Sequence, residues 1–505
     1  MSESQATSRS LDRRCAWLLF FFLNAVFILT STGRVHTQDE NMTLLTTESL
    51  ALRQTTELAP QEITRGFYGR YDVRGHARSA YGFAHSALLV PWFMVGTLAQ
   101  YLSGLSATAV SFAVAFPVVL SSATFSAGTV AMMFMLFRAL AAPLGVSLMA
   151  ALAVAFSTPI FAYSAWMFSE PLLTFLVVSA AYACFGLADT EELSARRGFW
   201  AGLLLGYAVL VRPTAIILAP LFVLAILVAR RRQGVRPAID LVLMVVLGAA
   251  FTLAYNAAVF GSPFEFGYPD VAEGGRQLNT FRTPVFRGLM GFLFAPGKSI
   301  FIFAPAILLS IAAMPRLWRR NKGLAVAAYA APIAYLLFFS RYTSWEGGFS
   351  YGPRYLVPAL TLLAVGVAAF FHESPKRWRV FGYALVLAGF AVQVLGISVS
   401  FTEAAVNGYY DPRWDYRMDY NAVGQHLRVL SKYLSDPNPA PAGVGFDRWF
   451  VFLHREGFST AALWGMAAPV LCVAFASAFG LYRCVRQQRK NAPAMVDSAT
   501  AHLGG

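Results

Sequence analysis

Charged residues are scarce in this chain. Asp, Glu, Lys and Arg together make up only 13% of its 505 residues, whereas hydrophobic residues make up 57%. Average proteins carry about twice that share of charge, which soluble domains use to cover their surfaces. The mean hydropathy of +0.54 points the same way. This composition excludes a soluble globular protein and indicates a polytopic membrane protein.

Cysteine is also rare. The four cysteines are Cys15, Cys184, Cys472 and Cys484, and each lies inside or at the edge of an apolar run. No pair lies in a polar loop, where an oxidising compartment would favour a disulfide. We therefore expect packing residues rather than a disulfide framework.

Apolar runs of nearly spanning length recur along the chain. They lie at about 15–33, 109–137, 143–165, 168–187, 198–211, 213–229, 238–260, 299–314, 323–340, 354–371, 379–402 and 459–482. We therefore predict an all-α fold, a polytopic transmembrane helical bundle of about 12 spans.

Positive charges indicate how the bundle is oriented. The formal net charge is +14, and Lys and Arg gather between alternate apolar runs, as the positive-inside rule requires of cytoplasmic loops. The clusters are Arg13/Arg14, Arg196/Arg197, Arg230 to Arg232, Arg316 to Lys322, Lys376/Arg377 and Arg483 to Lys490. Both termini are then predicted to face the cytoplasm. The charge reports topology, and no nucleic-acid partner is expected.

Three stretches near the N-terminus are ambiguous. Residues 84–102 are long enough to span a membrane, but a span there would place the later basic clusters outside. We interpret 84–102 as an external juxtamembrane or re-entrant helix and 46–58 as a second, amphipathic one. The run at 15–33 has basic residues before it, like a cleaved signal peptide, but its length favours an uncleaved anchor.

The informative polar residues fall near the external ends of separate predicted helices. Asp39 and Glu40 follow the first helix, at the start of a first external loop predicted over 34–108. A carboxylate at the bilayer surface is placed to deprotonate a hydroxyl, so Asp39 is a candidate catalytic base.

Glu170 and Arg212 flank apolar stretches. Glu170 lies in Ser169-Glu170-Pro171 at the start of a predicted helix, where the helix dipole and a site role explain an acid equally well. Arg212 has hardly any polar company, and a lone cation there needs an anionic partner. It either binds a lipid phosphate or snorkels to the headgroups.

A turn at 294–299 opens another predicted helix. Lys298 and the free N–H groups of that turn would suit a phosphate, although an ordinary Pro-Gly turn is an equal alternative. The GxxxxGK spacing of a P-loop is absent, so nucleotide binding is not expected.

The external segment 341–355 is dense in Trp, Tyr, Arg and Gly. Aromatic rings stack on sugars and Arg pairs with phosphate, so a glycosyl phosphate would suit this composition. An interfacial aromatic belt is the alternative. The candidate contacts are Arg341, Trp345, Glu346, Tyr351 and Arg354.

Taken together, these motifs resemble the GT-C superfamily of integral membrane glycosyltransferases. The matching stretches are Gln38-Asp39-Glu40, Phe168-Ser169-Glu170-Pro171, Leu210-Val211-Arg212-Pro213-Thr214, Phe294-Ala295-Pro296-Gly297-Lys298 and Trp345 to Tyr355. They resemble most the bacterial branch related to protein mannosyltransferases and lipid A aminoarabinose transferases. We accordingly divide the chain into a GT-C-like catalytic module, 1–371, and a C-terminal part, 372–505, with an external segment at 402–458 and a cytoplasmic tail.

The resemblance implies a reaction. In that branch a sugar is taken from a polyprenyl phosphate, and the first external loop carries the catalytic acid, at the place of Asp39 here. Glu40 would orient Asp39 or contact the acceptor, and the anomeric carbon would be inverted. The acceptor would be a protein, a lipid or a polysaccharide, at the external, periplasmic face of the bacterial inner (plasma) membrane.

The remaining candidates receive roles from the same resemblance. The donor phosphate would be bound by Arg212, Lys298 and Arg354, and substrate contacts would come from His85, Glu170 and the segment 341–355. No counterpart is visible for the metal-binding acidic pair of oligosaccharyltransferases, so a divalent metal stays open. In the external segment 402–458, the aromatic and acidic residues at 409–416 suit acceptor contacts, and a loop over the catalytic face is the alternative.

Two other classes of protein would use similar residues. A polyprenyl-lipid flippase or other transporter would show internal repeats and helices broken in mid-membrane. Neither is visible, and the polar residues gather at one face, so transfer is favoured. A polymerase or ligase acting on lipid-linked oligosaccharide would share the phosphate cations but need not use Asp39.

Overall fold

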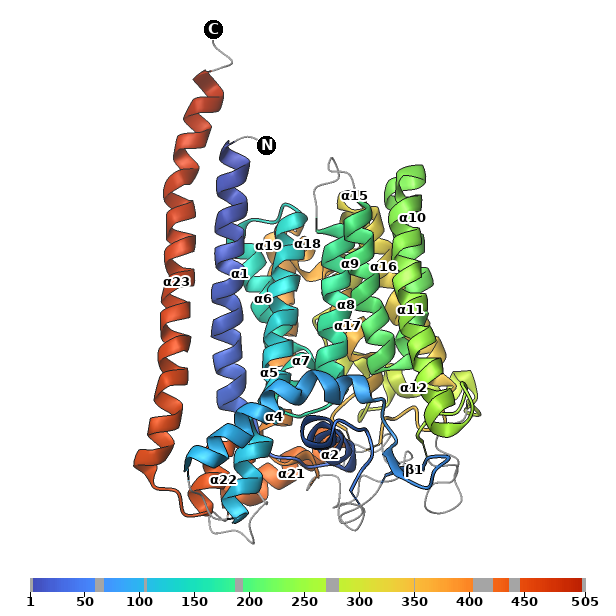
Figure 1. Cartoon of the computed structure of the whole chain (residues 1–505). Coiled ribbons are helices and arrows are strands. Elements are labelled where there is room, and N and C mark those ends of the chain that lie inside the picture. The colour runs from blue at the N-terminus through green and yellow to red at the C-terminus, as the bar shows by residue number, and fades with distance from the viewer. Residues whose placement is uncertain are drawn as a thin grey trace.

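A computed structural model describes residues 3–59, 68–103, 107–186, 194–268, 281–348, 350–402, 421–435 and 446–501. Within them the chain is almost wholly helical, with one two-stranded hairpin. Figure 1 shows most helices running side by side, and both chain termini at the same end of the bundle. The predicted all-α bundle is confirmed.

The bundle is built from long helices joined by short ones. The long helices are α1 (Glu3–Thr30), α5 (Ala107–Ala139), α6 (Leu144–Ser157), α8 (Ser169–Phe185), α9 (Ala195–Val211), α10 (Leu218–Arg230), α11 (Val235–Phe260), α16 (Lys322–Ser340), α19 (Lys376–Ser398) and α23 (Thr460–Ala501). The shorter ones are α7 (Ile160–Tyr163), α12 (Val285–Phe294), α13 (Ile300–Phe303), α14 (Ile307–Ala312), α15 (Met314–Arg320), α17 (Val357–Leu363) and α18 (Gly366–Glu373), with the 3-10 turns η1 (Pro213–Ile217), η2 (Arg231–Gly234) and η3 (Arg354–Leu356).

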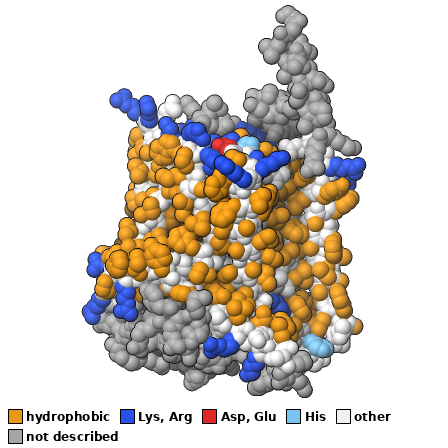
Figure 2. Space-filling view, turned by 180° about the vertical axis from the view of Figure 1, so that it is seen from behind, with side chains coloured by type: hydrophobic (Ala, Val, Ile, Leu, Met, Phe, Trp, Pro, Cys, Tyr) orange, Lys and Arg blue, Asp and Glu red, His pale blue; other side chains and the backbone are white. Residues whose placement is uncertain are grey.

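Seven described helical stretches are long and apolar enough to cross a membrane, or eight if the bent pair α17 and α18 is one span. One of the seven, Pro213–Phe260, contains both α10 and α11, which reverse direction at η2. Figure 2 shows hydrophobic side chains over the middle of the molecule, with Lys and Arg above and below them. The chain is therefore a multi-pass membrane protein, while the count of about 12 spans stays a prediction.

Small residues bring α9 and α11 together. Gly198, Gly202 and Gly206 follow one another at four-residue spacing along α9, and a Cβ on each would lie within 2.5 Å of the backbone of α11. Such glycines let helix backbones approach closely inside a membrane. This pairing fixes the lower end of α9, where Arg212 follows.

A layer of further elements lies at the lower end of Figure 1, on the face that the basic clusters predict to be external, and we call it the external layer. It contains α2 (Gln38–Arg53), β1 (Gly69–Tyr71), β2 (Ala77–Ser79), α4 (Phe83–Ser103), α21 (Ala422–Ser435) and α22 (Trp449–Arg455). Although α4 is long enough to span a membrane, it runs across the end of the bundle rather than along it. That placement is the juxtamembrane one predicted for 84–102.

The first loop corrects two sequence-based expectations. The helix predicted at 46–58 begins at Gln38 and ends at Arg53, so it includes Asp39 and Glu40. A hairpin that was not predicted follows, with β1 and β2 antiparallel. The helix begins early because Thr37 and Glu40 form a capping box that satisfies free N–H groups of its first turn.

Candidate functional site

Glu40 fixes the start of α2. Its carboxylate is fully buried, and Oε2 accepts hydrogen bonds from the backbone N–H groups of His36 (2.7 Å) and Thr37 (2.9 Å). Its other oxygen, Oε1, accepts from the N–H of Met167 at 2.8 Å. Glu40 therefore ties the loop after α1 to the connection that leads into α8, three residues before Glu170.

Asp39 lies beside Glu40 in the first turn of α2 but has different partners, and 27% of its side chain is exposed. Its Oδ2 lies 2.7 Å from Nη1 of Arg354, and its Oδ1 accepts a hydrogen bond from the Tyr81 hydroxyl. Burial, followed by the Asp39 charge, holds the pKa of Tyr81 well above its ordinary value. Tyr81 therefore stays protonated, and its hydroxyl donates the hydrogen bond to Asp39.

Arg354 joins two carboxylates. Besides its contact with Asp39, its Nε donates to Oε1 of Glu170 at 2.7 Å. The guanidinium also lies 4.1 Å over the ring of Phe168. Arg354 is buried and opens η3, directly after Pro353. One side chain therefore links the start of α2, the start of α8 and the segment 341–355.

Arg212 completes the row of charges. Its Nη1 donates to the same Glu170 oxygen at 2.6 Å, and its guanidinium lies 4.9 Å over the ring of Tyr355. Arg212 caps the end of α9. The anionic partner that the sequence required for it is thus Glu170, which is completely buried.

Three of these charged residues, Asp39, Arg212 and Arg354, line a cavity of about 80 Å³, large enough for several water molecules. Tyr81 and Tyr268 also line it. Its apolar lining includes Leu210, Val211, Phe260 and Phe266. The cavity therefore combines cations, a carboxylate and an apolar wall next to the membrane-spanning helices.

His85 reaches the same cavity from α4. It is only 5% exposed, and its Nε2 has no hydrogen-bond partner among the described residues. A buried ring nitrogen without a partner is available to a bound molecule.

The other predicted contacts lie outside this cavity. Lys298 is fully buried and donates to the backbone oxygen (3.0 Å) and hydroxyl (3.2 Å) of Ser350. Trp345 packs against Gly291 and Phe292 of α12. The Tyr351 hydroxyl donates to the carbonyl of Val392 in α19 at 2.6 Å.

Arg341 is exposed and donates to the Phe281 carbonyl at 3.5 Å, and Glu346, half-buried, does not line the cavity either. The structure therefore brings together Asp39, His85, Glu170, Arg212 and Arg354. Of the described residues in the aromatic-rich segment 341–355, only Arg354 lines the cavity, and the ring of Tyr355 packs against the guanidinium of Arg212.

Sequence reasoning missed Tyr81 and Tyr355 as parts of the site. Tyr355 adjoins Arg354 in the quoted motif, and this adjacency was an available signal. No such signal existed for Tyr81, because the hairpin that places Tyr81 beside Asp39 was not predicted. The residues at 409–416 lie outside the described part of the chain. Within the described residues, no three His, Cys, Asp or Glu side chains gather as they would around a metal ion.

Comparisons with known proteins found matches only among solved structures. No protein-family profile matches the chain, and no curated protein sequence does. Two of the matches are crystal structures of ArnT from Cupriavidus metallidurans, each 14% identical and covering 96% of this chain and 76% of that one. The TM-score is 0.47 for ArnT bound to undecaprenyl phosphate and 0.48 for its apo state.

Another match is the archaeal oligosaccharyltransferase AglB from Archaeoglobus fulgidus, in complex with an inhibitory peptide and a dolichol-phosphate. It is 13% identical, with a TM-score of 0.45, and the match covers 79% of this chain and 56% of that one.

Proposed function

We propose that this protein is a membrane glycosyltransferase of the GT-C type. It would move a monosaccharide from a polyprenyl-phosphate donor to an acceptor hydroxyl at the external face of the bacterial plasma membrane. The observation that carries this proposal is the row Asp39, Arg354, Glu170 and Arg212 beside one cavity. It offers a base and two phosphate-binding cations within one site.

Asp39 is assigned as the base. Tyr81 and Arg354 each contact one of its oxygens, and a carboxylate has about four lone-pair sites. Acceptor capacity therefore remains for an incoming hydroxyl. The partial exposure of Asp39 gives the acceptor a way in.

Arg212 and Arg354 are assigned to the donor phosphate. A guanidinium has five N–H donors, and the contacts with Asp39 and Glu170 use only some of them. Buried Glu170 holds both guanidiniums in place. They would stabilise the negative charge that grows on the departing phosphate. Lys298 we assign instead to holding Ser350, because its ammonium group lies away from the cavity lining.

The bond changes follow from this arrangement. The acceptor oxygen forms a bond to the anomeric carbon as the bond from that carbon to the phosphate oxygen breaks. Asp39 takes the hydroxyl proton, and polyprenyl phosphate leaves with the electron pair. Attack from the face opposite the phosphate inverts the anomeric carbon. The apolar wall of Leu210, Val211 and Phe260 would contact the lipid, and His85 would contact a polar group of either substrate.

The test is a transfer assay on membranes that contain wild-type protein or the Asp39→Asn variant. A panel of radiolabelled polyprenyl-phosphate sugars is supplied, and label is followed into protein, lipid and polysaccharide fractions. We expect one labelled fraction with wild type. Removing a general base typically costs about 10²- to 10⁴-fold in rate, so Asp39→Asn should fall by at least the lower figure.

Asp72→Asn is the matched control. Asp72 is a buried carboxylate of the same external loop, and it pairs with Arg78 at 2.8 Å outside the cavity lining. This variant should retain transfer. Near-normal transfer by Asp39→Asn would place the base elsewhere. Lipid flipping without transfer by wild type would favour a transporter.

A further inference from the structure

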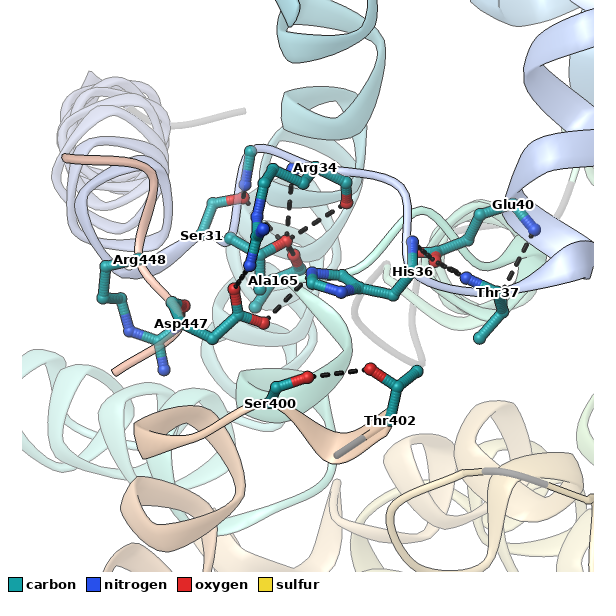
Figure 3. A network of polar contacts seen from close by, with 12 residues as sticks. Ser31, Arg34, His36, Thr37, Glu40, Ala165, Ser400, Thr402, Asp447 and Arg448 are labelled. Carbon is teal, nitrogen blue, oxygen red and sulfur yellow. Dashed lines mark hydrogen bonds and ion pairs between the residues drawn. The ribbon is translucent and has the colours of Figure 1, made fainter. Parts of the chain in front are cut away.

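The loop that leads to Asp39 is joined to a segment more than four hundred residues away in the sequence. Asp447, which is 3% exposed, pairs through Oδ1 with Nη2 of Arg34 at 2.5 Å and through Oδ2 with Nε2 of His36 at 3.0 Å. Figure 3 shows Arg34 and His36 converging on this carboxylate. One buried acid thus holds two side chains of the loop.

The neighbours of Asp447 extend the same contact along the backbone. We call residues 446–449 the C-terminal clamp. The N–H of Trp449 donates to the Ser31 carbonyl at 3.3 Å, and its indole N–H donates to the Ile28 carbonyl at 3.0 Å. Gly33 adopts a positive φ of 67° and lies so close to the clamp that a Cβ on it would come within 2.7 Å of Trp449 Cβ.

The opposite side of the loop is held by different elements. The Ser31 and Thr32 hydroxyls donate to the Ala165 carbonyl at 3.3 and 3.1 Å. The N–H of His36 donates to Glu40. His36 therefore lies between two carboxylates. Its ring faces Asp447, and its backbone N–H faces Glu40, which follows Asp39 in α2. Any shift of the clamp acts on the segment that presents Asp39.

We propose that Asp447 is a positioning residue for the transfer reaction, which fixes Arg34 and His36 and thereby the loop that presents Asp39 to the cavity. This inference rests on the proposed function of Asp39. It makes the C-terminal part of the chain a component of the catalytic unit, although Asp447 itself contacts no reacting atom.

The charge states of the cluster predict its pH dependence. The groups that face His36 are Asp447, Glu40 and Arg34, and Arg448 adjoins Asp447. Burial by itself lowers the pKa of His36, but Asp447 and Glu40 outweigh burial and raise that pKa above its ordinary value of 6.5. Burial by itself raises the pKa of Asp447, but His36 and Arg34 outweigh it and hold that pKa below 3.8.

Each shift gives one limit of the stable range. Because the pKa of His36 is raised in the folded protein, the stability that protonated His36 contributes is complete below pH 6.5. It is lost as the pH rises through the folded-state pKa of His36. Because the pKa of Asp447 is lowered in the folded protein, the stability that ionised Asp447 contributes is complete above pH 3.8. It is lost as the pH falls through the folded-state pKa of Asp447. The clamp is therefore strongest in mildly acidic solution and loosens as His36 loses its proton.

The test is Asp447→Asn, assayed for kcat and donor KM across pH. Misplacement of a catalytic group by an ångström costs up to about 10²-fold in rate, so we expect kcat to fall by about ten- to a hundredfold. Donor KM should stay nearly unchanged, because Arg212 and Arg354 are untouched. Without the Asp447 carboxylate, the ion pair with His36 is absent at every pH, so the loss of kcat relative to wild type should be largest in mildly acidic solution and smaller at alkaline pH. A merely structural loss would lower activity equally at every pH.

Two further variants guard against misfolding. His36→Gln keeps the Arg34–Asp447 pair and should remove the alkaline decline while the protein stays folded. Glu373→Gln is the matched control, because Glu373 at the end of α18 pairs with Arg320 at the end of α15. Figure 1 shows α15 and α18 toward the end of the bundle opposite α2. It should leave both the pH profile and the loop unchanged.

Backbone hydrogen exchange of residues 31–45 supplies a readout that does not depend on activity. Asp447→Asn should speed this exchange, and Glu373→Gln should not. Unchanged loop exchange, or a wild-type kcat and pH profile in Asp447→Asn, would overturn the proposal. Absence of any transfer by wild type would instead refute the proposed function, while the exchange experiment still reports whether Asp447 holds the loop.

Discussion

Arg354 has an anionic neighbour on each side, Asp39 at 2.7 Å and Glu170 at 2.7 Å. Burying such charges costs desolvation energy, and apolar side chains of similar volume often stabilise a protein equally well. Stability alone therefore does not explain why two guanidiniums and two carboxylates meet beside a cavity at the membrane surface. Charged networks in such places are more typical of substrate sites.

Replacing Arg212 tests the phosphate assignment. Arg212→Ala should weaken the binding of polyprenyl phosphate more than the binding of the acceptor, because its guanidinium contacts Glu170 and lines the cavity. Arg212→Lys should restore binding only in part, since an ammonium lacks the planar fork that pairs with two oxygens. Equilibrium binding of polyprenyl phosphate to detergent-solubilised protein measures both. Wild-type affinity in Arg212→Ala would leave snorkelling to the headgroups as the better explanation.

The Glu40→Gln variant tests whether Glu40 supports the structure of the site or takes part in the chemistry. Both Glu40 oxygens accept N–H groups, Met167 on one and His36 and Thr37 on the other. In glutamine, an NH₂ group replaces one of the two oxygens and cannot accept a hydrogen bond. At least one buried backbone N–H group then loses its acceptor, which lowers the free energy of unfolding by about 1–3 kcal/mol. We expect a lower melting temperature and a smaller loss of turnover than in Asp39→Asn. A loss as large as that of Asp39→Asn, without a change in melting temperature, would make Glu40 the base.

At the scale of elements, the start of α2 was readable from sequence and the partners of Asp39 were not. Thr37 and Glu40 have the spacing of a capping box, which would have placed Asp39 in the first helical turn. Tyr81 and Arg354 reach Asp39 from a hairpin and from η3. Contacts between segments so far apart depend on how the whole bundle packs, and no local pattern encodes them.

The segment 341–355 shows a second limit of sequence reasoning. Its aromatic composition predicts sugar contacts, but Trp345 and Tyr351 are buried against α12 and α19. An aromatic ring suits stacking on a sugar and packing in a core equally well, so composition alone does not separate the two. The cations were more informative, because a cation near an apolar run requires an anionic partner wherever it lies.

Gly33 tests how closely the loop after α1 fits its surroundings. Gly33→Ala combines a positive φ of 67° with a Cβ placed 2.6 Å from the ring of Phe116. Gly75→Ala is the control, because Gly75 has a φ of 82° but no atom within 4 Å of the added Cβ. The positive φ alone costs about 1–2 kcal/mol, so the melting temperature should fall more in Gly33→Ala. Equal falls would show that the close approach can relax.

At the scale of the whole molecule, the sequence predicted the multi-pass bundle and the gathering of Asp39, Glu170, Arg212 and Arg354 at one end of it. Both rest on long-range regularities, namely apolar runs and the alternation of basic clusters. The exact spans are harder to assign, because some main helices of the bundle have fewer than the roughly 20 residues that usually cross a membrane. The helix α6 has 14 residues and α8 has 17.

Cysteine labelling tests the orientation. Gln38→Cys and Arg74→Cys should react with an impermeant thiol reagent in intact cells, and Gln233→Cys should not. All three positions are exposed, with the first two in the external layer and Gln233 in η2 among basic residues. The background should carry Cys472→Ser, because Cys472 is exposed. Labelling at Gln233 from outside would reverse the orientation and move the site to the cytoplasmic face.

The contact between Asp447 and the loop after α1 has a consequence for biosynthesis. The ribosome makes Asp39 early and Asp447 roughly 400 residues later, which takes about 20–80 s at ordinary rates of elongation. Until then, the loop has left the ribosome without the carboxylate that holds Arg34 and His36. A nascent or truncated chain would thus carry Asp39 on an unsupported loop, and the proposed transfer would begin only when the segment that contains Asp447 has joined that loop.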